Sequence, residues 1–308
     1  MATEHKVTFD FYHVRTTSGK SFSRVLDNVL IKSGRQRNEP IDSGSQCRLH
    51  TAGQSGNLWH GEMIRIRMNN LPPAASLDGE IDDLKLDDNQ GIGLGAAFLF
   101  DSKRDVIVMQ RNKQAISSRV FVRYMSAKGG CGEVRLLPIM SSNAWKRFNN
   151  MDKAKKLIVR IAPMEHMHVM KGSRHGVEDI ANLSRKIDAP VLEITASIGY
   201  NRDRALSLKG VKAFINELLA ISPDHSELDK LKIGGKDENN ESDEIDLLEE
   251  FIAETLSIGS DEIVGENDRR VLGYEARHNA ALRAWENRCP ELDLLLNSDR
   301  ETEDEIST

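Results

Sequence analysis

The side chains in this sequence that are best suited to bind a ligand are basic. Arg and Lys supply the phosphate contacts that dominate the affinity of proteins for nucleic acids. The interleaved Tyr124 and Trp145 could stack on an unpaired base, although the same residues also fit an ordinary solvated surface with Trp145 in the core. Four of the basic residues fall within thirteen residues that contain no acid: Arg111, Lys113, Arg119 and Arg123. The sequence therefore predicts a nucleic-acid-binding surface with nine candidate residues: Arg65, Arg67, Arg111, Lys113, Arg119, Arg123, Arg135, Lys146 and Arg147.

The stretch DDNQGIGLGAAFLFD, residues 87–101, has glycines at positions 91, 93 and 95 and raises the possibility of a dinucleotide phosphate site. Such a site needs a strand before G-x-G-x-x-G and a helix after it, so that the helix N-terminus meets the pyrophosphate. Here an acidic segment precedes the glycines, and the apolar residues that follow them predict a strand, a turn and a second strand. We therefore interpret the glycines as flexible backbone that enters a strand.

Few residues have the spacing that catalysis requires. His166 and His168 in MEHMHVM would share a face of a strand, but no carboxylate or cysteine motif accompanies them as metal ligands. Glu193 is a single carboxylate in a predicted strand, whereas a nuclease core needs several. The sequence has no G-x-S-x-G motif and no Walker motif. We therefore predict no catalytic residues, no metal site and no cofactor, and keep a metal-dependent nuclease as the alternative.

Composition limits the class of protein. The chain has 308 residues, of which 39% are hydrophobic and 29% are charged, and no apolar run approaches the roughly 20 residues that span a bilayer. Its first residues do not have the pattern of a signal peptide. The three cysteines are widely spaced, which favours free thiols in a reducing compartment: Cys47, Cys131 and Cys289. The sequence therefore predicts a cytoplasmic protein without a membrane segment.

The net charge of -6 conceals a difference between two parts of the chain. Residues 1–222 contain 33 Lys and Arg against 23 Asp and Glu, a net charge of +10, and the remaining 86 residues contain 9 against 25, a net charge of -16. Such an asymmetry is typical of a basic part that binds nucleic acid beside an acidic module, although a solvated surface also varies along a chain. We expect a basic α+β domain over 1–222, an acidic and mostly helical module over 223–297 and a disordered tail over 298–308.

The elements that would position the basic side chains alternate between strands and helices. Residues 59–70 alternate as a strand does, which places Met63, Ile64 and Ile66 near a core and Arg65 and Arg67 together on the other face. Other strands are predicted at 7–15, 96–112 with a turn, 133–141, 155–163 and 191–199. Apolar spacing predicts helices at 21–33, 177–187, 208–220, 244–258 and 271–297. The pattern predicts an α+β fold with a mixed or antiparallel sheet, flanking helices and a helical, acidic C-terminal part.

The order of elements from SFSRVLDNVL through DDNQGIGLGAAFLFD, VIVMQRN, RLLPIM and LIVRIAP resembles the phage lambda exclusion protein RexA and a set of bacterial proteins of similar length, over residues 7–220. The resemblance implies a bacterial, cytoplasmic and non-enzymatic DNA-binding protein, a homodimer that acts in abortive phage exclusion as an antiviral defence. It also implies DNA rather than RNA as the ligand. No site residue transfers by motif, so the candidate residues rest on the charge pattern alone.

The mode of binding and the oligomeric state follow from weaker patterns. No helix-turn-helix or zinc finger accompanies the basic residues, so we expect binding that is largely indifferent to base sequence. The helix from Leu272 carries residues that could pack against a second copy or, equally well, against its own core: Tyr274, Ala281, Leu282 and Trp285. A third interpretation is a protein-interaction module whose acidic end docks a basic partner or covers its own basic face.

Overall fold

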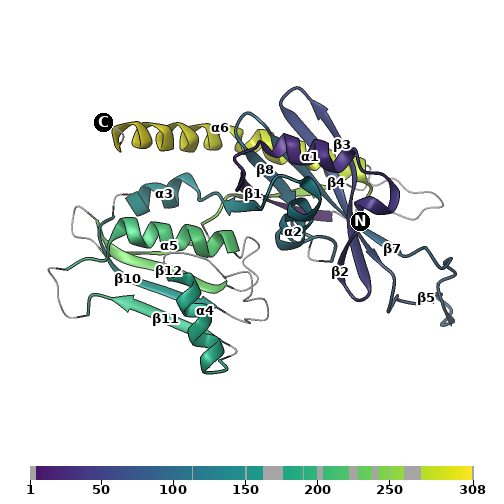
Figure 1. The fold of residues 1–308 in the computed structure, drawn as a ribbon, viewed down its shortest axis with the longest axis horizontal. Helices are drawn as coiled ribbons and strands as arrows, with labels where there is room; N and C mark the ends of the chain where they lie inside the picture. The colour runs from purple at the N-terminus through teal and green to yellow at the C-terminus, as the bar shows by residue number, and fades with distance from the viewer. Residues whose placement is uncertain are drawn as a thin grey trace. The chain divides into compact units, whose positions relative to one another are not determined.

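The computed structural model of the chain describes residues 5–112, 114–149, 151–161, 176–189, 191–199, 204–221, 228–237, 242–248, 250–259 and 272–306. The chain divides into two compact units. Unit 1 comprises Met1–Arg135 and Ala253–Arg288, and unit 2 comprises Leu136–Ile252 and Cys289–Thr308. Both units contain helices and strands (Figure 1), so the α+β fold class predicted from the sequence is confirmed.

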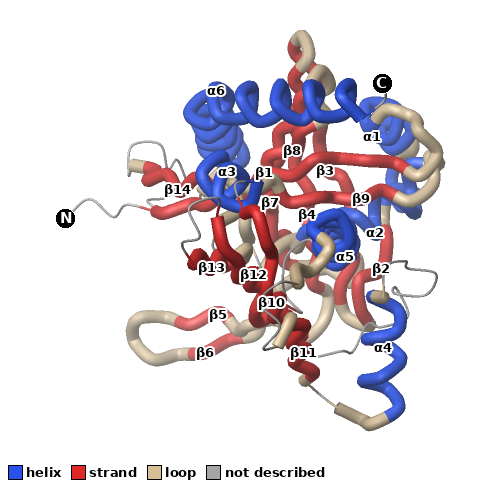
Figure 2. The backbone as a smooth tube through the Cα atoms, turned by 90° about the vertical axis from the view of Figure 1, so that its left-hand side faces the viewer, coloured by secondary structure: helices blue, strands red, loops and turns tan. Residues whose placement is uncertain are grey.

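Unit 1 is built on a sheet with the strand order β14-β1-β8-β7-β4-β3-β2, and β9 also pairs with β1. Along this order each strand is antiparallel to its neighbours. The central strands lie side by side in Figure 2. The strands of this sheet are β1 (His5–Thr16), β2 (Glu39–Asp42), β3 (Ser45–Ser55), β4 (Leu58–Arg67), β7 (Ile92–Asp101), β8 (Val106–Gln110), β9 (Val134–Pro138) and β14 (Ala253–Ile258).

Aromatic side chains hold α1 (Phe22–Leu30) and α2 (Ser118–Gly129) against one face of this sheet. Phe22 of α1 meets Phe100 of β7 edge to face, with ring centroids 5.0 Å apart, and Phe121 of α2 meets Phe98 at 5.5 Å. All four rings are almost completely buried. The helical spacing of apolar residues predicted an amphipathic helix here, and Ser21 is the N-cap residue of α1.

The opposite face of the sheet receives the first turns of α6 (Tyr274–Ile306). There the Arg277 guanidinium pairs with the Glu62 carboxylate of β4 and donates to the Gly95 carbonyl of β7 at 3.2 Å. Gly91 directly precedes β7, Gly93 and Gly95 lie within it, and β7 pairs with β8 as the hairpin that the sequence predicted. A Cβ at Gly95 would collide with the Glu62 carboxylate and with Arg277, so this glycine makes room for a buried ion pair.

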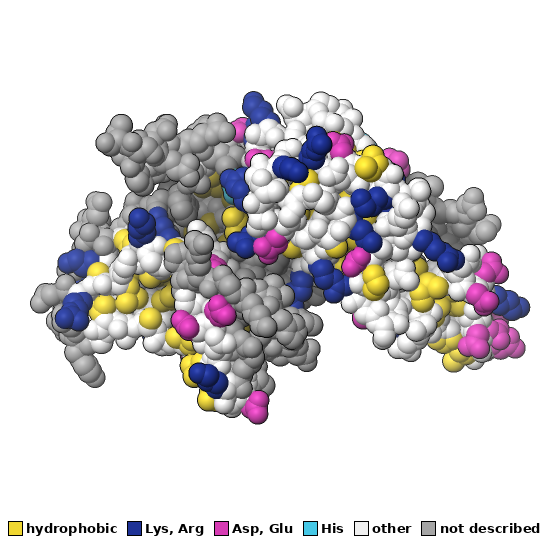
Figure 3. All heavy atoms as spheres, in the orientation of Figure 1, with side chains coloured by type: hydrophobic (Ala, Val, Ile, Leu, Met, Phe, Trp, Pro, Cys, Tyr) yellow, Lys and Arg dark blue, Asp and Glu magenta, His cyan; other side chains and the backbone are white. Residues whose placement is uncertain are grey.

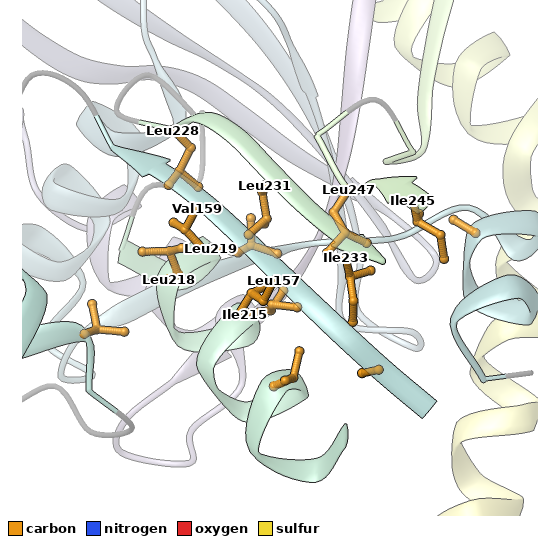
Figure 4. Packing of buried hydrophobic residues seen from close by; sticks show 14 of the residues in the cluster. Leu157, Val159, Ile215, Leu218, Leu219, Leu228, Leu231, Ile233, Ile245 and Leu247 are labelled. Atoms are coloured by element: carbon orange, nitrogen blue, oxygen red, sulfur yellow. The ribbon is translucent and has the colours of Figure 1, made fainter. Parts of the chain in front are cut away.

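Unit 2 contains a four-stranded sheet with the order β11-β10-β12-β13. Leucine, isoleucine and valine side chains from β10, β12, β13 and α5 form its core, which is shown in Figure 4. Among them Leu231, Ile233 and Ile245 are fully buried. The elements of unit 2 are α3 (Ser142–Asn149), β10 (Met151–Ile161), α4 (Val177–Lys186), β11 (Leu192–Ser197), α5 (Leu208–Ile221), β12 (Leu228–Asp237) and β13 (Ser242–Asp246). The 3₁₀ helix η1 (Gly34–Arg37) and the short strands β5 (Ala74–Ala75) and β6 (Ile81–Asp82) belong to unit 1.

The C-terminal third differs most from the sequence-based expectation. The helix expected at 244–258 is wrong, because this segment enters the two sheets as β13 and β14. The expected boundary at residue 222 falls inside unit 2, and the module expected to be mostly helical contains β12, β13 and β14. The helix α6 continues past Pro290 to Ile306, so most of the segment expected to be disordered is helical. The last turns lack Gly and Pro and are rich in Glu, which explains why a helix can continue there.

Two smaller expectations also need correction. Met63 is buried on the same face of β4 as Arg65 and Arg67, and not on the opposite face, because side chains two positions apart in a strand point the same way. The continuous apolar run at 191–199 is typical of a buried strand, but β11 is an edge strand and most of its residues are exposed. Within the described residues, no helix is long and apolar enough to cross a membrane.

Candidate nucleic-acid interface

The predicted basic residues that the structure describes divide between the two units. Arg65, Arg67, Arg111, Arg119, Arg123 and Arg135 belong to unit 1, whereas Lys146 and Arg147 belong to unit 2. Lys113 lies outside the described residues, as do His166 and His168, and the side chains of Trp145 and Lys146 are not described. The candidate interface is therefore decided by what surrounds each arginine of unit 1.

Arg111, Arg135 and Arg147 each have an acidic partner, as does Arg65, which pairs with Asp42 at 2.9 Å. Arg111 makes two hydrogen bonds with the Asp10 carboxylate across β8 and β1, Nε donating to Oδ2 at 2.9 Å. Arg135 pairs with Glu133 at 2.9 Å, and in unit 2 Arg147 pairs with Glu250 at 2.9 Å. A guanidinium that binds a carboxylate in this way offers a phosphate less charge and fewer free donors. The ion pairs of Arg111, Arg135 and Arg147 are therefore best explained as contacts that stabilise the fold.

The arginines of α2 lie against the edge of the sheet. Arg123 donates to the carbonyl groups of Pro40 and Ile41 in β2, the latter at 3.2 Å. β2 is an edge strand that pairs with β3 on one side, and Arg123 supplies a side-chain donor to its carbonyls. Arg119 is half-buried one turn earlier and also has a partner. Tyr124 is fully buried, so it cannot stack on a base as predicted.

The remaining two predicted residues, Arg65 and Arg67, line a polar hollow of about 540 Å³ at one end of the sheet. The turn between β2 and β3, the end of β4, the start of β7 and the loop before α2 all contribute to its wall. Its lining residues are Asp42, Ser43, Gly44, Ser45, Arg65, Arg67, Asn69, Asn70, Leu94 and Gln114. Gln114 comes from the segment of the predicted Arg111 to Arg123 cluster, and it is the residue of that cluster's range that lines the hollow among the described residues.

The electrostatics of the hollow depend on the pairing of Arg65. Arg65 donates to the Asp42 carboxylate at 2.9 Å and to the Ser45 hydroxyl at 3.0 Å, while its Nε is buried without a hydrogen-bond partner in the described part of the chain. The Gly44 N–H, 2.8 Å from Asp42 Oδ1, holds the pKa of Asp42 below its usual value, and Ser45 and Arg65 act in the same direction. Asp42 is therefore ionised at neutral pH and competes with any anion for Arg65.

Arg67 is the more available cation of the pair. It is two residues further along β4, on the same face as Arg65, and its side chain makes no hydrogen bond or ion pair with the residues that the structure describes. Around it the amides of Asn69, Asn70 and Gln114 supply further donors. Two arginines, three amides and two serine hydroxyls converging on one open hollow are suited to bind an anion rather than an apolar small molecule.

The amides and serines were missed in the sequence because only basic and aromatic residues were weighed. NN follows the strand at 69–70, and DSGS at 42–45 is a typical tight turn. Both signals mark where the backbone reverses beside an arginine-bearing strand. They do not show that the two turns meet.

A second polar cluster lies under the first turn of α6. The ring of His60 is 4.6 Å from that of His278, and His60 Nδ1 is 3.0 Å from the Tyr274 hydroxyl. Burial raises the pKa of Tyr274 to about 12 and lowers that of His278. These contacts hold α6 on the sheet beside the buried Glu62 to Arg277 pair. Within the described residues no three His, Cys, Asp or Glu side chains form a group that could hold a metal ion.

The chain is thus an α+β protein with a curved antiparallel sheet in unit 1 and an arginine-lined polar hollow beside that sheet. The chain belongs to DUF6731, a family of unknown function, whose family pattern matches residues 2–265. This match covers all of the strands and helices described above except α6. No curated protein matches the chain.

Proposed function

We propose that this protein binds nucleic acid and that the hollow at Arg65 and Arg67 holds one phosphate of the ligand. The observation that carries the proposal is that Arg65 and Arg67 lie on one face of β4 beside amide and hydroxyl donors. Arg65 already binds Asp42, whereas Arg67 has no partner among the described residues. Arg and Lys contacts to phosphate dominate nucleic-acid affinity. Among the described side chains, the other predicted arginines have partners within the protein: Arg111, Arg119, Arg123, Arg135 and Arg147.

The choice of ligand within this class rests on the resemblance to the RexA-like exclusion proteins. That resemblance favours DNA over RNA and a role in antiviral defence by abortive infection in the bacterial cytoplasm. The hollow itself has no side chain that reads a base edge from a recognition helix, so binding is largely independent of base sequence.

The test compares two single substitutions in the full chain by fluorescence anisotropy with labelled duplex DNA, single-stranded DNA and RNA. Arg67→Ala should weaken binding and reduce the slope of log affinity against log salt by about one unit, because one phosphate contact is lost. Arg135→Ala is the matched control, because this exposed arginine pairs with Glu133 away from the hollow. It should change neither quantity.

Three outcomes would reject the proposal. The first is no binding of any nucleic acid by the unaltered chain, and the second is equal affinity and salt slope for Arg67→Ala and the unaltered chain. The third is binding of inorganic phosphate alone. Cleavage of the DNA that depends on Mg²⁺ and stops with a chelator would instead support the metal-dependent nuclease.

A further inference from the structure

An acidic arm extends from the sheet of unit 1 between β4 and β7. We define the arm as residues 71–90, which contain β5 and β6. These two strands pair through Ala74 with Asp82 and Ala75 with Ile81, and the Ser76 N–H donates to the Glu80 carbonyl at 2.8 Å. From residue 72 onward every residue of the arm is exposed, and Figure 2 shows the hairpin of β5 and β6 extending away from the sheet. The arm has a defined backbone without a packed side-chain core.

The arm combines charge with exposed aliphatic side chains. Its twenty residues include six acids and one lysine, a net charge of -5. Figure 3 shows acidic and hydrophobic side chains side by side where Figure 1 places β5. Its exposed large hydrophobic residues are Leu77, Ile81, Leu84 and Leu86. Aliphatic side chains gathered on one short projecting segment mark an interaction surface, whereas single exposed ones are ordinary.

Unit 1 also carries the complementary surface. Among the described residues of unit 1 outside the arm, one large hydrophobic side chain is exposed. This residue is Ile31, with 80% of its surface accessible. Ile31 is the C-cap residue of α1 and lies in a basic segment. Residues 20–37 of this segment contain five Lys and Arg and one Asp. Arg24 and Arg35 of this segment are exposed, and neither makes an ion pair with a described residue. We define Arg24, Ile31, Lys32 and Arg35 as the basic end of α1.

A second exposed aliphatic group, in unit 2, does not have this complementarity. Leu183, Ile187 and Val191 lie at the end of α4 and just beyond it. Residues 177–191, however, contain three acids and two bases, so this segment would not attract an acidic arm. Charge therefore selects the basic end of α1.

We infer that the arm of one copy of this chain docks on the basic end of α1 of a second copy, with the arm aliphatics covering Ile31 and the arm acids facing Arg24 and Arg35. Figures 1 and 2 place β5 and α1 on different sides of unit 1, so the contact forms between copies. When each copy supplies both surfaces, the exchange closes as a two-fold pair. This inference is independent of the hollow at Arg65 and Arg67.

Charge reversal in the full chain tests the contact. The arm variant is Asp82→Lys with Asp83→Lys, and the helix variant is Arg24→Glu with Arg35→Glu. All four positions are exposed, so folding is expected to be unaffected. Each variant alone faces like charge across the contact, and its dissociation constant for dimerisation should rise about tenfold or more. A mixture of the two variants should restore the dimer, because each arm then meets a surface of opposite charge.

Sedimentation velocity at micromolar concentration measures the dimer fraction, and the matched control is Lys6→Glu with Lys103→Glu, two exposed lysines outside both surfaces. The unaltered chain should be dimeric, and added salt should weaken the dimer. A monomeric unaltered chain overturns the inference, as does a dimer that both reversals leave intact. Failure of the mixture to restore a dimer that each reversal destroyed also overturns it.

Discussion

At the residue scale, the basic side chains differ chiefly in what already binds them. Arg111, Arg135 and Arg147 each bind a carboxylate, while Arg67 binds none in the described chain. An exposed ion pair contributes little to stability, about 0–1 kcal/mol, but it occupies the donors that a phosphate would use. The functional value of an arginine in this protein therefore depends on its neighbours more than on its exposure.

A titratable residue with a structural role is His13 on β1. Burial, and next the charge of Arg15, lowers the pKa of His13 from 6.5 to about 4. In the unfolded chain the imidazole has its ordinary pKa, so between these two values the unfolded state binds a proton that the folded state does not. The contribution of His13 to the free energy of unfolding is therefore fully present above pH 6.5 and is lost as the pH falls toward about 4.

We predict that lowering the pH from about 7.5 to about 5 costs the unaltered protein about 2 kcal/mol through this residue. His13→Asn should lack this part of the pH dependence, whatever it does to stability at neutral pH. Urea unfolding at both pH values measures the difference, with His50→Asn as a control at an exposed position of β3. The same loss of stability in His13→Asn as in the unaltered chain would contradict the prediction.

At the scale of elements, the contact between α6 and the sheet depends on a glycine. The side chains of Arg277 and Glu62 are only 13% and 6% exposed, and they meet directly above Gly95. A buried ion pair is costly to break because it leaves an uncompensated charge. The absence of a side chain at Gly95 is thus a condition for α6 to lie on β4 and β7.

Gly95→Ala should destabilise the protein by about 3 kcal/mol, because the added methyl group separates the buried pair. Gly93→Ala is the matched control two residues earlier on the same strand, where a Cβ would lie in ordinary contact with Ile64, at 3.7 Å. Urea unfolding of the two variants under one condition measures the difference. Equal stability of both variants would show that the ion pair does not hold α6.

At the scale of the whole molecule, the boundary between the basic and the acidic part of the chain does not coincide with the boundary between the two compact units. Residues 1–222 have a net charge of +10, and residues 223–308 have a net charge of -16. Part of the acidic segment forms β12 and β13 of unit 2, and another part forms β14 of unit 1. The end of α6 is a strongly acidic stretch tethered to residues 1–222, which have a net charge of +10, and tethered opposite charges meet at an effective concentration in the millimolar range.

We predict that deleting residues 298–308 tightens DNA binding at low salt, because acidic side chains that compete with phosphate are removed. The advantage should disappear as salt screens the attraction. The deletion removes five acids: Asp299, Glu301, Glu303, Asp304 and Glu305. Fluorescence anisotropy of both proteins over a salt range measures the effect, and equal affinities at low salt would mean that this stretch only aids solubility.

The sequence by itself determined those helices and strands in which the spacing of apolar residues matches the face that the element buries. Alternation in β1 and β4, helical spacing in α1 and α5, and the glycines that lead into β7 all correspond to the structure, because each signal is local. The same reasoning assigned residues 244–258 to a helix, since LLEEFIAETL has apolar residues at a spacing that fits a helix as well as a buried strand. Residues 253–258 of this segment form the strand β14 because they pair with β1, which lies more than two hundred residues away in the chain.

The candidate site shows the same division. The sequence identified Arg65 and Arg67 as neighbours on one face, because the period of a strand fixes that relation. Only the tertiary structure placed the turn at Ser43–Gly44, the amides of Asn69 and Asn70 and the side chain of Gln114 around them. The structure also shows that Arg111 pairs with Asp10 and Arg147 with Glu250, so carboxylates from distant segments occupy both guanidinium groups. A partner contributed by a distant segment is set by strand order and register, which no local pattern of charge encodes.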